Sequence, residues 1–148
     1  MDCYQKAVQL LGLRPHFRRE LEVKLARRGF PAEEVEAALD RLTDHGYLDD
    51  LKAARGFAAQ RLARGEGRVK VRAELLRRGA APEAAEQAVA EVLPEDDRAA
   101  ALAAAARWRA RGGEDEQALA RHLQRKGFSR RAIVAALRQE AGPDPDSP

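Results

Sequence analysis

The amino-acid sequence predicts an all-α protein made of three tandem three-helix repeats in an elongated array. Composition is the first reason, because 45% of the 148 residues are apolar but only 5% are aromatic. Sheets favour β-branched and aromatic residues, whereas the alanine and arginine that are abundant here favour helices. The second reason is a pattern of glycines and apolar residues that occurs three times. A chain of this length forms one domain or a short tandem array.

The repeated pattern is centred on three glycines that are 50 and 48 residues apart. Apolar residues stand eight and four positions before each glycine, and six and ten positions after it. Two basic residues directly precede each glycine. A match at so many positions indicates repeated structure rather than chance. The segments are Leu21–Leu39, Val71–Val89 and Leu119–Leu137, around Gly29, Gly79 and Gly127.

Each segment is predicted to fold as a helix, a tight turn and a second helix. Apolar residues four positions apart lie on one face of a helix. The glycine supplies the positive φ that often ends a helix, and Phe30 or Phe128 then folds back onto that helix. Pro31 and Pro82 are expected at the first position of the second helix, where a missing N–H is tolerated. Ser129 is expected to be an N-cap.

A further helix is predicted before each pair, which gives nine helices in all. These helices are expected at Tyr4–Leu11, Leu51–Ala63 and Asp97–Ala110. Asp49 or Asp50 is expected to cap the second of them.

The predicted domain organisation follows from this helix count. A unit of about 50 residues buries little apolar surface alone, so neighbouring repeats must cover one another. The C-terminal tail is rich in proline and aspartate and is expected to be disordered. The repeats are predicted at residues 1–47, 48–94 and 95–141, and the tail at 142–148.

Positive charge is concentrated in the middle of the chain. Residues 51–79 hold nine basic and two acidic residues, a net charge of +7, whereas residues 80–98 hold one basic and six acidic residues, a net charge of −5. Single charges on a helix commonly pair with neighbouring charges. A block of +7 predicts instead a surface that attracts phosphates or an acidic protein groove.

Arginine suits such contacts, because its planar fork binds a carboxylate or phosphate through two hydrogen bonds. The basic pair before each glycine would repeat the contact along the array. The alternative interpretation of these pairs is that they complement the negative end of a helix dipole. The predicted partner-binding residues are Arg27, Arg28, Arg61, Arg64, Arg68, Lys70, Arg72, Arg77, Arg78, Arg125 and Lys126.

The sequence shows no set of residues that converges on a reaction, so we expect a protein that is not an enzyme. His16, His45 and His122 stand at no metal-ligand spacing with one another or with Cys3. Gly65-Glu66-Gly67 lacks the Lys-Ser/Thr that completes a phosphate-binding loop, and it is interpreted as a hinge. We therefore expect no metal and no cofactor.

The expected location is the cytoplasm. A single cysteine permits no internal disulfide, as is usual for a reducing compartment. The longest apolar run, residues 99–106, is too short to cross a bilayer. We expect a monomer that does not associate with membranes.

Several motifs in the middle of the chain resemble the signature of the RecX regulatory proteins. They are Gly46-Tyr47-Leu48-Asp49-Asp50, then Phe57-Ala58 and Arg61, and then Glu74-Leu75-x-x-Arg78-Gly79. Similar motifs around Gly29 and Gly127 extend the resemblance over residues 4–140. The segment Arg14–Phe17 departs from it, because the family usually shows Arg-x-Arg-Ser there.

The resemblance implies three three-helix modules bent into a crescent, so we expect the array to be curved. It also implies a regulator that binds the groove of the RecA filament on single-stranded DNA. Such a regulator modulates, most often by inhibition, the recombinase, ATPase and SOS coprotease activities of RecA. Weak direct binding to DNA is implied as well.

Other functions stay open at this point. A helical protein that binds DNA without the recombinase is the main alternative, and it predicts steep salt dependence of DNA binding. A nuclease or another enzyme would need catalytic residues that the sequence does not bring together. A plain helical scaffold leaves the basic block unexplained.

Overall fold

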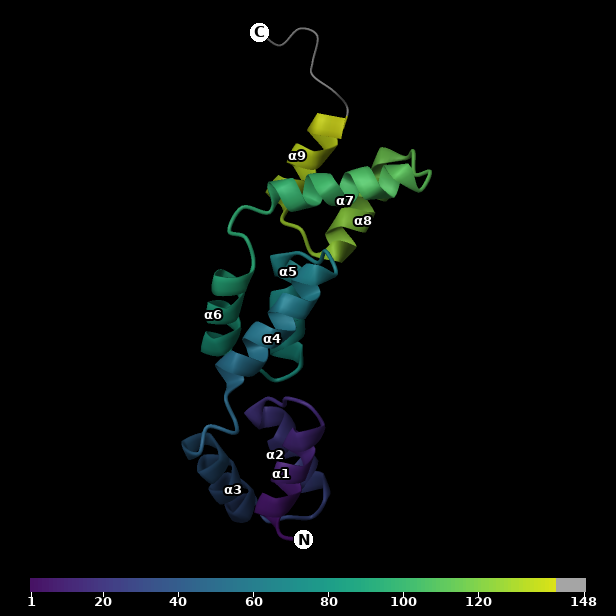
Figure 1. Ribbon diagram of the computed structural model, residues 1–148. Helices are drawn as coiled ribbons and strands as arrows, with labels where there is room; N and C mark the ends of the chain where they lie inside the picture. The colour runs from purple at the N-terminus through teal and green to yellow at the C-terminus, as the bar shows by residue number, and fades with distance from the viewer. Residues whose placement is uncertain (141–148) are drawn as a thin grey trace, which may run out of the picture. The chain divides into compact units, whose positions relative to one another are not determined.

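The computed structural model describes residues 1–140, which form nine α-helices and no β-strand (Figure 1). The prediction of an all-helical repeat protein is confirmed. The boundaries of the repeats and the curvature of the array stay predictions, and the predicted tail at 142–148 lies outside the described residues. The helices are α1 (Cys3–Leu13), α2 (Arg18–Arg27), α3 (Ala32–Asp44), α4 (Asp50–Ala63), α5 (Arg68–Arg77), α6 (Pro82–Val92), α7 (Arg98–Ala110), α8 (Glu116–Lys126) and α9 (Arg130–Glu140).

The periodic apolar positions lie in the interior, as predicted. Ten of the twelve side chains are buried, and Ile133 and Leu137 are half-buried. Gly29, Gly79 and Gly127 have φ values of 90°, 96° and 94°, so each supplies the left-handed conformation that ends its helix. The repeated sequence pattern therefore corresponds to three α–turn–α pairs, α2–α3, α5–α6 and α8–α9.

The predicted helix starts agree with the structure to within one residue, and Pro31 differs in its role. Pro82 is the first residue of α6, as predicted. Ser129 acts as the N-cap of α9, because its hydroxyl oxygen accepts a hydrogen bond from the Ala132 amide at 3.2 Å. Asp49 caps α4 by accepting one from the Lys52 amide at 3.1 Å. Pro31 was expected inside α3, but its ψ of 147° is extended, so it is the N-cap and α3 begins one residue later.

The described chain divides into two compact units. The first contains Met1–Phe57 and Glu74–Ala88, and the second contains Ala58–Ala73 and the chain from Val89 onward. The core of the first unit includes Leu21, Leu25, Leu39 and Leu42 from α2 and α3, packed against α1.

The core of the second unit depends on small side chains. Ala101, Ala104 and Ala105 of α7 pack with Ala132 and Ala136 of α9. Small residues let two helix backbones approach closely, and α7 lies across α9 (Figure 1). Leu119 and Leu123 of α8 and the following Phe128 complete this core, and Trp108 is half-buried at the edge of the core.

Two aspartates connect helix starts within the units. In the first unit, Asp50 accepts hydrogen bonds from the backbone amides of Arg18 (2.9 Å) and Ala81 (3.1 Å). In the second unit, Asp97 accepts hydrogen bonds from the amide (2.8 Å) and hydroxyl (2.7 Å) of Ser129. Ala81 and Ser129 both stand two residues after the glycine of their repeat. The contact therefore recurs, and it satisfies amides that have no partner within a helix.

The equivalent residue of the first repeat is Pro31. Proline has no backbone N–H, so no carboxylate is needed at this position.

Within the second unit, the start of α5 meets the end of α8. The Gly67 amide donates to the Lys126 carbonyl at 2.8 Å, and the Val69 amide donates to the Gly127 carbonyl at 3.1 Å. Unpaired N–H groups at one helix start thereby satisfy unpaired carbonyls at another helix end. We call this contact the α5–α8 junction. A Cβ on Gly67 would lie 2.5 Å from the Gly127 carbonyl oxygen, so only glycine allows the backbones to approach this closely.

The divergent segment Arg14–Phe17 forms the connection between α1 and α2. His16 is buried, and its Nδ1 lies 2.9 Å from the Arg14 carbonyl oxygen. Its Nε2 lies 2.8 Å from the Lys24 ammonium, an arrangement in which a neutral ring accepts the hydrogen bond. Burial lowers the pKa of His16, as do the charges of Arg14 and Lys24. Glu20 pairs with Arg14 and accepts a hydrogen bond from the Phe17 amide at 3.1 Å.

We predict that Gly67→Ala destabilises the protein by about 2 kcal/mol, the cost of overpacking a close contact. Its matched control is Gly56→Ala in α4, where an added Cβ has no atom within 4 Å. This control should stabilise the protein by about 0.5–1 kcal/mol, since alanine favours a helix over glycine. Chemical denaturation measures both. A Gly67→Ala protein as stable as the wild type would show that the junction does not require this close approach.

Candidate partner-binding surface

Four predicted partner-binding residues lie at helix ends in the first unit. Arg27 and the C-cap Arg28 end α2, and both are exposed. Arg77 is the last residue of α5 and Arg78 follows it, and both contact Glu74, with N–O distances of 2.8 and 3.6 Å. The Arg78 guanidinium also lies over the Phe57 ring, 4.9 Å from its centroid. Cations at these helix C-termini complement the negative end of each helix dipole, and their side chains remain at the surface.

Arg61 and Lys70 have a partner inside the second unit. Glu66 is 9% exposed, and the two cations neutralise it at distances of 3.2 Å from Arg61 and 2.6 Å from Lys70. The Arg61 side chain is itself only 16% exposed, whereas Lys70 is 38% exposed. A buried carboxylate requires such partners. Arg61 therefore has a structural role here, and its predicted contact with a partner stays a prediction.

The electrostatics of Glu66 reflect these ion pairs. Burial alone would raise its pKa, but hydrogen bonds and charge from Lys70 and Arg61 outweigh burial and hold the pKa below its ordinary value. Glu66 is therefore ionised at neutral pH. The sequence identified the 65–67 segment only as a hinge, because the partners of Glu66 become apparent only in the fold.

The α5–α8 junction brings together cations that are far apart in sequence. The Lys126 ammonium donates a hydrogen bond to the Arg64 carbonyl at 3.3 Å, although 62 residues separate them. A Cβ on Gly65 would lie 3.3 Å from Nη2 of Arg107, so this guanidinium also reaches the same turn. We define the junction surface as Arg64, Lys70, Arg107 and Lys126.

Arg107 was missed by the sequence analysis, because nothing in the repeat pattern distinguishes it. The basic pair before Gly127 did predict Lys126, and Arg125 beside it is exposed. Three helices, α5, α7 and α8, thus contribute Lys70, Arg107 and Lys126 to one positive surface, and Arg64 joins it from the turn that follows α4.

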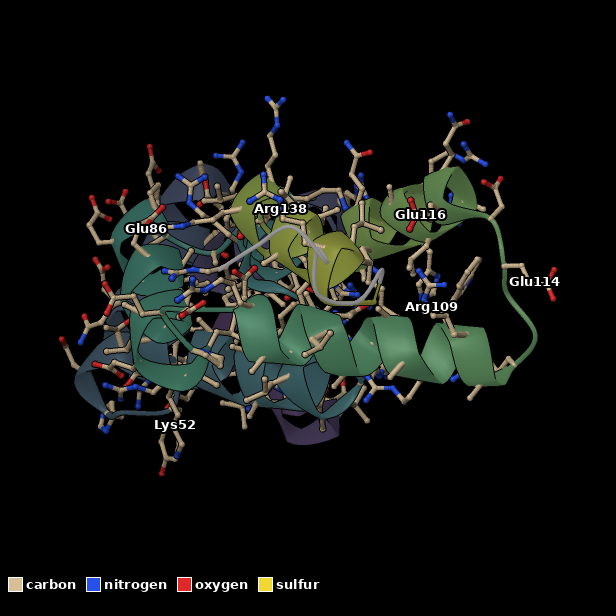
Figure 2. The ribbon with its side chains drawn as sticks, turned by 90° about the horizontal axis from the view of Figure 1, so that it is seen from above. Lys52, Glu86, Arg109, Glu114, Glu116 and Arg138 are labelled. Atoms are coloured by element: carbon tan, nitrogen blue, oxygen red, sulfur yellow. The ribbon has the colours of Figure 1, made fainter. Side chains whose placement is uncertain are left out.

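Two further candidates, Arg68 and Arg72, lie on α5. Arg68 is half-buried and donates to the Glu95 carbonyl at 2.9 Å, so it supports the connection between α6 and α7. Arg72 is exposed. Not every arginine in the second unit faces outward, since Arg109 lies between α7 and α8 with Nη2 3.9 Å from Glu116, while Glu114 points away on their connection (Figure 2).

The described residues show nothing that resembles a metal centre. Among them, no three metal-ligating side chains (His, Cys, Asp or Glu) lie close enough together to hold an ion. Every helix within residues 1–140 also falls short of the length and apolar character needed to cross a bilayer. The fold and this surface together define a helical-repeat protein with guanidinium and ammonium groups gathered at its surface.

Known proteins place the chain in a family. The family model for the first three-helix domain of RecX matches residues 3–42. The chain is 44% identical over 138 residues to the regulatory protein RecX of Thermus thermophilus, covering 92% of each chain. It is 35% identical over 140 residues to the regulatory protein RecX of Vibrio parahaemolyticus, covering 93% of this chain and 90% of the relative. The chain belongs to the RecX family of regulatory proteins.

Solved structures agree with the fold. The crystal structure of RecX from Lactobacillus salivarius superposes with a TM-score of 0.81 at 19% identity and covers 93% of both chains. A second crystal structure of a regulatory protein RecX gives a TM-score of 0.76 at 22% identity, covering 90% of this chain and 69% of that one. The relatives are named as regulatory proteins rather than as enzymes.

We predict that Glu66→Gln lowers the free energy of unfolding at pH 7 by about 2 kcal/mol, because it leaves two cations without their charged partner. The folded pKa of Glu66 lies below its unfolded value. The ionised Glu66 carboxylate therefore stabilises the fold fully at pH values above its pKa in the unfolded chain. This stabilisation is lost as the pH falls through its lower pKa in the folded protein.

Urea denaturation across acidic and neutral pH measures this effect. The difference between the wild type and Glu66→Gln should shrink as pH falls below about 4.5. The exposed Glu22→Gln serves as the control and should differ little from the wild type at any pH. A pH-independent difference for Glu66→Gln would contradict the ion-pair assignment.

Proposed function

We propose that this protein regulates the RecA recombinase by binding its filament on single-stranded DNA. In this proposal it lies along the filament groove and inhibits recombination, ATP hydrolysis and SOS coprotease activity. The observation that carries the proposal is the relationship to RecX regulatory proteins over about nine-tenths of the chain. The basic surfaces of both units give this role a physical basis.

The distribution of cations suits a partner made of repeated subunits. The first unit offers Arg27 and Arg28, and the second unit offers Arg64, Arg125 and Lys126. Once one weak contact has formed, the remaining basic groups are held at a high effective concentration near the next subunit, so strong binding needs no single large interface. Carboxylates of a protein groove and phosphates of the enclosed DNA are both suitable acceptors for these groups.

Occupation of the groove supplies a mechanism for inhibition. A helical protein held there excludes duplex DNA or the SOS repressor from the same space. A regulator that contacts more than one filament subunit also opposes any movement that changes the spacing between these subunits. Neither effect requires a reaction by the regulator, in agreement with a protein that is not an enzyme. The cytoplasm, where the filament forms, is the proposed location.

We predict that Arg64→Glu/Arg125→Glu raises the concentration needed for half-inhibition of RecA by about tenfold, because two attractive charges become repulsive. The measurement is RecA ATPase activity on single-stranded DNA during titration with the regulator. The matched control is Arg111→Glu/Arg121→Glu, which makes the same charge change at exposed positions of the same unit. Thermal denaturation checks that both variants are folded.

Two results would contradict this proposal. A folded wild-type protein that leaves RecA activity unchanged would exclude filament regulation. If the protein then bound DNA alone with steep salt dependence, the alternative function of a DNA-binding protein acting without the recombinase would be correct. Equal inhibition by Arg64→Glu/Arg125→Glu and the wild type would remove these residues from the contact surface.

A further inference from the structure

The last helix, α9, differs in charge from its equivalents in the other two repeats. Position four after the repeat glycine holds Glu33 in α3 and Glu83 in α6, but Arg131 in α9. Position eleven holds Asp40 in α3, Ala90 in α6 and Arg138 in α9. The helix pair is retained, but α9 carries positive charge at two positions where α3 carries negative charge and α6 carries one negative charge and one alanine.

This reversal does not serve the stability of α9. The positive end of a helix dipole favours acidic residues in the first turn and disfavours cations there. The first turn of α9 contains Arg130 and Arg131 and no acidic residue. Both side chains are exposed, so they are not needed to fill the core either.

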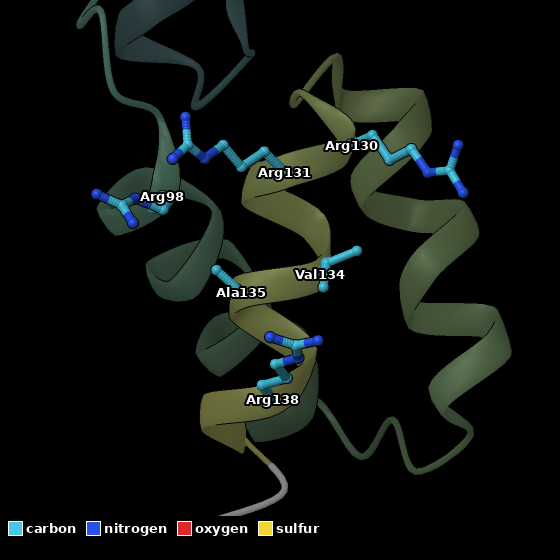
Figure 3. A pocket seen from close by; sticks show the side chains of 6 residues that line it. All are labelled: Arg98, Arg130, Arg131, Val134, Ala135 and Arg138. Atoms are coloured by element: carbon cyan, nitrogen blue, oxygen red, sulfur yellow. The ribbon is translucent and has the colours of Figure 1, made fainter.

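The arginines line an open pocket of about 450 Å³ in the second unit. Figure 3 shows Arg131 extending from one side of α9, toward Arg98, and Arg130 from the other side, with Arg138 two turns further along the helix. Among the side chains that the structure describes, which end at Arg138, no carboxylate forms an ion pair with Arg130 or Arg138. The six residues of the lining are Arg98, Arg130, Arg131, Val134, Ala135 and Arg138.

Arg98 is held in place at the edge of this pocket by Asp96. Its Nε and Nη2 donate to the Asp96 carboxylate at 3.0 and 2.7 Å. These hydrogen bonds lower the pKa of Asp96 to about 2, and the charge of Arg131 adds to the effect. One carboxylate thus serves two of the four arginines, and the pocket retains an excess of positive charge.

We propose that this α9 face is a binding site for the phosphodiester backbone of nucleic acid, separate from the residues proposed above to contact the filament. The four guanidinium groups only donate hydrogen bonds, which matches a partner that only accepts them. A phosphate backbone is such a partner, whereas a protein surface presents donors as well. The lining contains no aromatic side chain on which a base could stack. Binding is therefore independent of base sequence.

The spacing of the arginines fits this ligand. Arg130 and Arg138 are eight residues apart, which corresponds to about 12 Å along a helix. That length spans roughly three to four nucleotides at the axial spacing of one strand of a duplex. The small side chains of Val134 and Ala135 leave room for the sugar–phosphate chain to approach the helix. Arg98 and Arg131 then reach phosphates from the side of α7.

The test is Arg130→Gln/Arg138→Gln, which removes two cations without introducing repulsion. We expect its affinity for labelled oligo-dT, measured without RecA, to fall about tenfold. The slope of log affinity against log salt should decrease by roughly 1.4, as for two lost contacts with a single strand. Duplex DNA should compete with oligo-dT, because both present the same phosphates. Melting temperature should stay unchanged or rise, since a first-turn cation is removed.

The matched control is Arg111→Gln/Arg121→Gln, which removes two exposed charges from the same unit. It should retain the affinity and the salt slope of the wild type. Equal losses in both double variants would mean that net charge, not this face, determines binding, and would overturn the proposal. An unchanged affinity in Arg130→Gln/Arg138→Gln would overturn it too.

The RecA ATPase assay separates this proposal from the filament proposal. Loss of oligo-dT binding with normal inhibition of RecA supports the α9 site and leaves the filament proposal intact. Normal oligo-dT binding with lost inhibition would show that the α9 face contacts protein, and the phosphate assignment would be wrong. The two proposals are therefore judged by different readouts.

Discussion

The α5–α8 junction is the contact on which the ion pairs and the junction surface of the second unit depend. Its two backbone hydrogen bonds, from Gly67 and Val69, bring the start of one short helix against the end of another. Short helices leave a large share of their backbone groups unpaired, so such contacts have strong consequences for packing. The junction places Lys126 beside Arg64 and buries Glu66 next to it. The buried carboxylate in turn requires Arg61 and Lys70.

This dependence divides the basic residues into two kinds. Arg61 and Arg68 form contacts within the protein, with Glu66 and the Glu95 carbonyl, and their charge or donors are already engaged. Arg64 and Arg125 are exposed and are better suited to an outside partner. The +7 charge of residues 51–79 thus overstates the positive charge that is free at the surface, because part of it stabilises the fold.

The sequence predicted the fold well because the signals for it are local. A glycine with positive φ, an apolar spacing of four and a capping side chain each act within one or two turns of helix. Pro31 was placed one residue too far into α3, since proline fits both the N-cap and the first turn. The roles of Asp50 and Asp97 were not predictable in the same way. Their partners, Arg18, Ala81 and Ser129, lie about 30 residues away.

The prediction of the basic surface residues was limited in the same way, because contacts between residues far apart in sequence could not be predicted. The basic pairs at Arg27, Arg77 and Arg125 could be found from their position before a glycine. Arg107 could not, because it belongs to the surface only through its approach to Gly65. The charge reversal in α9 was present in the sequence, but its meaning needed the structure. Only the structure shows that Arg98 of α7 joins the arginines of α9 in one pocket.

Repetition of a scaffold explains how one chain acquires different surfaces. The buried positions of the three helix pairs are constrained by packing, and the second and third pairs also share the recurrent aspartate contact, so the pairs stay alike. The outer positions of α3, α6 and α9 are free of this constraint, and their charges have diverged from acidic to basic. An acidic face on one repeat and a basic face on another cannot favour the same ligand. Divergence of outer residues on a common core therefore gives the repeats surfaces of different charge without any change of fold.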